Sequence, residues 1–142
     1  VNTPSIRPDP ETPMTFPRIL SAALIAIGMA TAPVAALAAD PTGTWQSTSG
    51  ESRYKVTYCG DGTQLCAKLT WLRNDARTPE NLQLLGAYVV KGATPTAENK
   101  WQGAVRYQGD TYEGNVTLVS SDAMKLSGCK GMFCQSMSFK RL

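Results

Sequence analysis

The stretch YKVTYCGDGTQLCAKLTW, residues 54–71, contains two of the four cysteines of a chain that has no histidine. Apolar and polar residues alternate on both sides of its glycine-rich centre, which is typical of a β-hairpin with one buried face. Placing Cys59 opposite Cys66 sets each inward residue against another inward residue, as a half-buried hairpin requires. The inward pairs are then Tyr58 with Ala67, Val56 with Leu69, and Tyr54 with Trp71.

The segment KLSGCKGMFCQSMSF repeats this arrangement near the C-terminus, with Cys129 and Cys134 at the hairpin end. This pairing sets Leu126 opposite Met137 and Met124 opposite Phe139. Opposed strand residues have Cβ atoms about 4.5–5.5 Å apart, and a disulfide needs about 3.5–4.5 Å, so a bridge is plausible at a non-hydrogen-bonded pair. The spacing therefore predicts disulfides Cys59–Cys66 and Cys129–Cys134, each contributing about 2–2.5 kcal/mol. The sequence leaves a crossed pairing of the two hairpin ends open.

Metal and redox roles for these cysteines are not expected. Zinc sites use closely spaced cysteines or histidines, and the chain has no histidine. A dithiol oxidoreductase requires a C-x-x-C motif at a helix start, which does not occur here. The sequence therefore predicts no metal and no cofactor.

The N-terminal region has the features of a secretory signal over residues 14–38. Arg18 provides a positive charge, residues 19–29 are apolar, and Ala36 to Ala38 fit an A-x-A cleavage site. The apolar run is short for a membrane span of about 20 residues, although an uncleaved anchor helix is an alternative. Residues 1–13 are rich in proline and precede Met14, which indicates a misassigned start or a disordered leader. Export would leave residues 39–142 as one small domain, periplasmic or secreted, where cysteines oxidise.

Residues 39–142 show period-two alternation broken by turn residues, which predicts an all-β domain. Short connections favour a small antiparallel up-and-down β-barrel of about eight strands, with a flatter sheet or a sandwich as alternatives. A turn at Gly109-Asp110 would set Tyr107 opposite Tyr112. In the longest connection, Thr78-Pro79-Glu80 predicts a capped helical turn or a lid-like loop. The strands are expected to begin near Thr44, Ser52, Leu65, Ala87, Lys100, Thr111, Ala123 and Phe133.

Several segments, taken in order, resemble an exported bacterial family called domain of unknown function 2147: GTWQ, YCGDGTQLCAKLTWL, LLG, KWQGAVRYQGDTYEG and LSGCKGMFCQSMSFKR. The resemblance covers Gly43 to Arg141 and implies a lipocalin-like, calycin-type barrel. Many members carry Asn-Pro-Asp where this chain has TPENLQ, so the role of that loop is not transferred. The resemblance also implies that Arg141 lies over Trp45 and closes one barrel end, a contact worth about 0.5–2 kcal/mol.

A barrel of eight strands encloses either packed side chains or one small ligand. The first hypothesis is therefore an exported protein that binds a small apolar or aromatic ligand. The alternative is a filled barrel that serves as an envelope interaction module, through the loop 73–85 or an outer face. The candidate lining residues are the inward aromatic and methionine side chains: Tyr54, Tyr58, Trp71, Trp101, Tyr107, Tyr112, Met124 and Met137.

An enzyme is not expected, because histidine, the usual base near neutral pH, is missing. Asp61, Asp110 and Asp122 fall in predicted turns, where aspartate is common for backbone reasons. Only Asp75 and Glu80, in the long connection, offer a carboxylate pair.

The charges from residue 39 onward are 12 Lys/Arg against 9 Asp/Glu. The basic residues are scattered singly between Arg53 and Arg141, whereas nucleic-acid and anionic-membrane sites need clusters. The pattern therefore predicts a solvated surface, no nucleic-acid partner, and no stable membrane span after signal cleavage.

Overall fold

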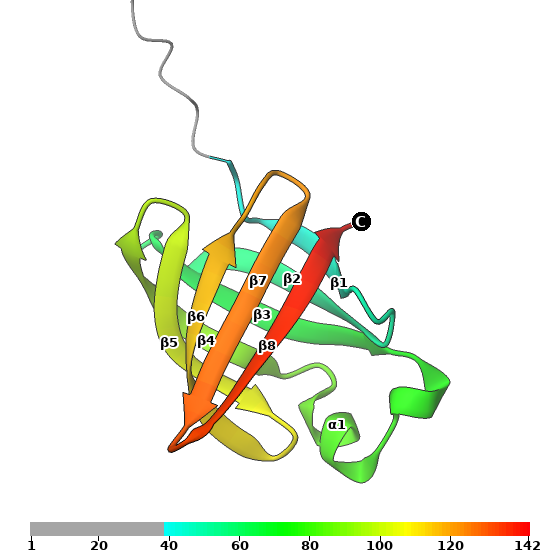
Figure 1. Ribbon diagram of the computed structural model, residues 1–142. Coiled ribbons are helices and arrows are strands. Elements are labelled where there is room, and N and C mark those ends of the chain that lie inside the picture. Colours follow the sequence, from blue (N-terminus) through cyan, green and yellow to red (C-terminus); the bar gives the residue numbers. More distant parts are fainter. Residues whose placement is uncertain (1–38) are drawn as a thin grey trace, which may run out of the picture. The chain divides into compact units, whose positions relative to one another are not determined.

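The computed structural model describes residues 39–142, which form a closed antiparallel β-barrel (Figure 1). Each strand pairs with the next, and β8 pairs with β1, so the sheet has no open edge. The prediction of an all-β, eight-stranded up-and-down barrel is confirmed. The expected leader (1–13) and signal peptide (14–38) lie outside the described residues. The strands are β1 (Gly43–Ser47), β2 (Ser52–Cys59), β3 (Gln64–Leu72), β4 (Tyr88–Ala97), β5 (Lys100–Tyr107), β6 (Asp110–Leu118), β7 (Ala123–Lys130) and β8 (Phe133–Arg141).

Two short helices lie between β3 and β4: η1 (Asn74–Ala76) and α1 (Pro79–Leu84). Thr78 caps α1, since its hydroxyl oxygen accepts from the Asn81 N–H at 3.2 Å, and proline occupies the first turn. The predicted helical turn is thus present. Leu84 is buried and anchors α1 to the barrel core. No helix within residues 39–142 has the length and hydropathy needed to cross a membrane.

The β7–β8 hairpin has the predicted register, with Cys129 opposite Cys134. Both predicted disulfides form, with Cα–Cα distances of 5.9 Å for Cys59–Cys66 and 4.0 Å for Cys129–Cys134. The crossed pairing left open by the sequence is therefore wrong.

The β2–β3 hairpin differs from the predicted register by two residues. Cys66 lies opposite Thr57 and Cys59 opposite Gln64, so the disulfide joins diagonal neighbours. The ladder extends further because a tight turn, in which Asp61 accepts from Thr63 N at 2.9 Å, closes the hairpin. A shift of two residues leaves every side chain on the same face of the sheet, so most residues predicted to face inward do face inward.

The β5–β6 turn is also displaced from its predicted place. It lies at Gln108-Gly109, with φ values of 48° and 80°, and Val105 therefore lies opposite Tyr112. A type I′ turn requires positive φ at both central residues. The predicted Gly109-Asp110 turn is of type II′, which requires positive φ only at the first central residue. The register again shifts by two residues and preserves the faces.

Trp45 and Arg141 close one end of the barrel, called here the Arg141 end. The Arg141 Cζ atom lies 4.4 Å from the centroid of the Trp45 ring, and Trp45 is 1% exposed. The Arg141 guanidinium also donates to the carbonyl oxygens of Asp40, Thr42 and Ser121. This one side chain therefore ties the segment before β1 and the β6–β7 loop to the core. The opposite end carries α1 and the β5–β6 and β7–β8 turns, and is called the helix end (Figure 1).

Candidate functional site

The barrel interior is not completely filled by side chains. A cavity of about 80 Å³ lies inside, whereas a single buried water needs only about 10–15 Å³. Its walls are mainly aliphatic, aromatic and thioether groups. They include Val56, Leu65, Val90, Val105, Val116, Trp45, Phe139, Met124 and Met137.

Three glycines form a bare strip on the inner wall beside this cavity. Gly114 lies opposite Gly103 on one side and opposite Gly128 on the other, so the strip crosses β5, β6 and β7. A Cβ atom on Gly114 would overlap the Cγ2 methyl of Val105, and one on Gly128 would lie 3.1 Å from the Tyr112 Cβ. The absence of side chains here lets Val105 and Tyr112 pack closely, and it removes three side chains from the interior.

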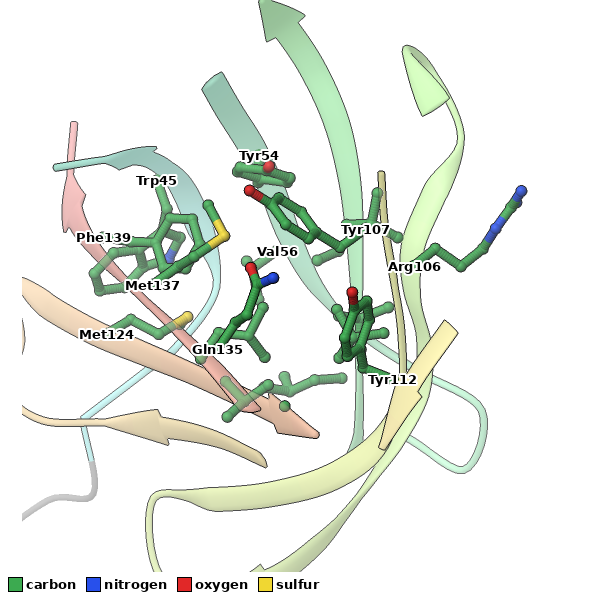
Figure 2. A pocket seen from close by; sticks show the side chains of 18 residues that line it. Trp45, Tyr54, Val56, Arg106, Tyr107, Tyr112, Met124, Gln135, Met137 and Phe139 are labelled. Atoms are coloured by element: carbon green, nitrogen blue, oxygen red, sulfur yellow. The ribbon is translucent and has the colours of Figure 1, made fainter. Parts of the chain in front are cut away.

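Three tyrosines and one glutamine bring polar groups to the cavity (Figure 2). Figure 2 shows the hydroxyl oxygens of Tyr54 and Tyr107 near each other, while Tyr112 and the Gln135 amide extend into the space below them. The Tyr107 and Tyr112 rings meet edge to face, with centroids 6.3 Å apart. Tyr54 packs in the same way against Phe139, with centroids 5.4 Å apart.

Burial raises the pKa of the Tyr54 hydroxyl, because the phenolate would lose its hydration. A hydrogen bond with Ser52 opposes this shift, and the nearby Tyr107 and Glu51 add to it. Tyr54 therefore remains protonated at neutral pH and presents a neutral hydroxyl that can donate or accept.

Five of the eight predicted lining residues reach the cavity: Tyr54, Tyr107, Tyr112, Met124 and Met137. Gln135 also lines it and was missed. Its position two residues before Met137 on β8 places it on the inward face, but a polar amide does not fit the apolar pattern by which the other lining residues are predicted.

Three predicted lining residues lie elsewhere. Trp71 faces outward because β3 contains a β-bulge at Thr70. Tyr54 pairs with Leu69, but the preceding residue Arg53 pairs with Trp71, so one extra residue reverses the alternation of faces. Tyr58 lies at the rim, one residue before the end of β2, and is 46% exposed. Trp101 is buried, but its indole N–H donates to the Thr63 carbonyl at 3.1 Å and ties the β2–β3 turn to the barrel instead of lining the cavity.

A second hollow of about 70 Å³ lies beneath α1 at the helix end. It adjoins the main cavity, with which it shares the lining residues Tyr54, Val89, Arg106, Tyr107 and Met137. Asn81 and Leu84 of α1 form part of its wall. The segment between β3 and β4 therefore covers the interior at this end.

The carboxylates of that segment are involved in ion pairs or are exposed. Asp75 accepts two hydrogen bonds from the Arg73 guanidinium, at 2.6 and 2.8 Å, which lower the pKa of its carboxyl. Glu51 lies 3.7 Å from the same guanidinium. Glu80 is exposed in the first turn of α1. Within residues 39–142, no three Asp, Glu, Cys or His side chains cluster in a way that could hold a metal ion.

Comparison with known proteins identifies a family for almost the whole barrel. A family model described as "Uncharacterized protein conserved in bacteria (DUF2147)" matches residues 43–141. No curated protein and no solved structure matches the chain.

Proposed function

The chain belongs to the DUF2147 family, and from that premise we propose that it is an exported protein that binds one small, uncharged, mostly apolar molecule in its barrel. The observation that carries this proposal is the cavity of about 80 Å³, with apolar walls and a group of tyrosine hydroxyls at one side. Small-molecule sites combine apolar walls with a few polar groups in this way. The two hairpin disulfides support an oxidising compartment.

The polar groups limit the chemistry of the ligand. A buried charge needs a charged or strongly hydrogen-bonded partner, and the lining offers only neutral hydroxyl and amide groups. Arg106 contributes to the wall, but its guanidinium points away from the cavity (Figure 2). A neutral ligand with one hydroxyl or carbonyl group therefore fits best, with its polar end toward Tyr54, Tyr107 or Tyr112.

Two small probes test the polar-end requirement: benzyl alcohol, which has one hydroxyl, and toluene, which has none. We expect saturable NMR shift changes at cavity residues with both probes, and tighter binding of benzyl alcohol. Native mass spectrometry of the protein from its own cells should also show retained small-molecule mass. If the probes cause no saturable shift changes and the purified protein retains no small-molecule mass, the proposal is contradicted.

A matched pair of variants distinguishes the cavity from the surface. Ala67 lines the cavity, whereas Ala104 is exposed on β5. Ala67→Leu should fill the space and abolish probe binding, and Ala104→Leu adds the same atoms outside and should leave binding unchanged. Equal binding by both variants would show that the probes bind outside the cavity.

The alternative function, an envelope interaction module, is favoured by one surface feature. Met132 and Phe133, at the tip of the β7–β8 hairpin, are 97% and 79% exposed. Such apolar exposure often marks a contact site. The double variant Met132→Ser/Phe133→Ser should then lose a partner cross-linked by the native protein in its own envelope, and an identical cross-linking pattern would contradict this function.

A further inference from the structure

Four basic residues that are scattered along the sequence meet on the outside of three neighbouring strands. Arg53 and Lys55 lie on β2, Lys68 on β3 and Lys91 on β4. They alternate with the inward residues of their strands, and Lys55 lies directly opposite Lys68 in the register. Lys91 lies opposite Cys66, two residues before Lys68. We call this surface the basic wall.

Acidic side chains do not balance the basic wall. The segments Ser52–Cys59, Gln64–Leu72 and Tyr88–Ala97 contain no aspartate or glutamate. Near its helix end, Glu51 and Asp75 both pair with Arg73 and are not available to these lysines. Like charges directly opposite each other on a sheet are destabilising, so the Lys55–Lys68 pair costs stability without a counter-charge from these strands.

The other side of the barrel is different. On β6, Asp110 and Glu113 lie among the basic residues of β5 and β7, and Asp110 pairs with Lys130. Lys100 and Lys125 both lie opposite Thr117, one on each side of it. Strands β5 to β8 carry six Lys and Arg against these two acidic residues, so this side is also positive overall. What distinguishes β2, β3 and β4 is that no acidic residue of these strands lies among their four cations.

Two aromatic side chains complete the basic wall. Arg53 Cζ lies 4.4 Å from the centroid of the Trp71 ring, and Lys68 Nζ lies 5.0 Å from that of Tyr88. Tyr88 is 44% exposed. Tryptophan and tyrosine with flanking lysine or arginine are the side chains that favour the boundary between water and lipid headgroups.

The form of the wall also limits its partner. It is the outer, convex side of a closed barrel (Figure 1), and none of its four cations lines either of the cavities described above. A convex surface without a groove suits a broad, flat anionic surface better than a single chain that must be held on several sides.

We propose that the basic wall docks the barrel, side-on, against an anionic phospholipid surface. The cations approach the lipid phosphates, while Trp71 and Tyr88 lie at headgroup level. This contact is independent of the proposed ligand site, since it uses the outer face of strands whose inner face lines the cavity.

Cosedimentation with vesicles tests the proposal, using the exported, oxidised protein. One set of vesicles is phosphatidylcholine alone, and in the other about one third of the lipid is phosphatidylglycerol. We expect binding to the anionic vesicles only, and weaker binding as salt rises. Each cation near such a surface contributes about a fivefold gain in partitioning, so Lys55→Gln/Lys68→Gln should weaken binding about 30-fold.

The matched control is Lys100→Gln/Lys125→Gln, which removes the same charge from β5 and β7, on the other side of the barrel. This control should lose much less affinity than the basic-wall variant. Equal losses would show that net charge alone drives binding and would overturn the proposal. Binding to soluble polyphosphate without binding to vesicles would overturn it in favour of a polyanion, and equal binding to both kinds of vesicle would exclude an electrostatic contact.

Discussion

Adding one methyl group at Gly114 should strain the barrel at its inner glycine strip. The Cβ atom of Gly114→Ala would overlap Val105 Cγ2, and it would lie 3.4 Å from the carbonyl oxygens of Gly103 and Ser127. Val105 is β-branched and buried, so its methyl cannot turn aside easily. The two carbonyl groups belong to paired strands, which resist displacement.

The magnitude follows from overpacking of a closed core, which typically costs about 1–3 kcal/mol per inserted group. For a domain of this size, 1 kcal/mol changes the melting temperature by about 4–8 °C. Gly114→Ala should therefore lower the melting temperature by about 5–20 °C. Val105→Ala removes the obstructing methyl, so the double variant should be less destabilised than the sum of the two single variants.

Urea unfolding of the four proteins, followed by tryptophan fluorescence, measures this coupling as a double-mutant cycle. We expect a favourable coupling of at least about 1 kcal/mol between the two substitutions. Additive effects, or a Gly114→Ala variant as stable as the native protein, would refute the packing argument.

Three further predictions concern the ends and the interior of the barrel. Arg141→Gln should destabilise the protein by about 2–3 kcal/mol in urea unfolding, because it removes the contact with Trp45 and three hydrogen bonds to carbonyls; an unchanged midpoint would contradict this role. Replacing Cys129 and Cys134 by serine should cost about 2 kcal/mol, and reductant should then lower the melting temperature less than it does in the native protein. Because the folded state raises the pKa of Tyr54, its contribution to stability is complete below the unfolded pKa near 10 and is lost as pH rises through the folded pKa. Tyr54→Phe should therefore reduce the alkaline loss of stability in pH-dependent melting curves, and parallel curves would contradict this.

The local pattern of the sequence was sufficient for the architecture. Alternation with period two decides which side chains face inward, and this assignment survives an error of two residues in register. For that reason the barrel, the two disulfides and five of the eight lining residues were predictable, although two hairpin registers were wrong.

Other features depended on contacts between strands, which no local pattern contains. The extra residue Thr70 turned Trp71 to the outside, and the type I′ turn at Gln108 set the register of the second hairpin. The glycine strip of the inner wall also depends on strand pairing, which makes Gly103, Gly114 and Gly128 neighbours.

The basic wall shows most clearly that a local sequence pattern does not contain the contacts between strands. In the sequence successive members of its four cations are 2, 13 and 23 positions apart, and they look like ordinary surface charges. Antiparallel pairing of β2 with β3 and of β3 with β4 brings those charges together. The sequence by itself determined which residues face outward, and only the tertiary structure decided which of them are neighbours, because strand pairing joins residues that are distant along the chain.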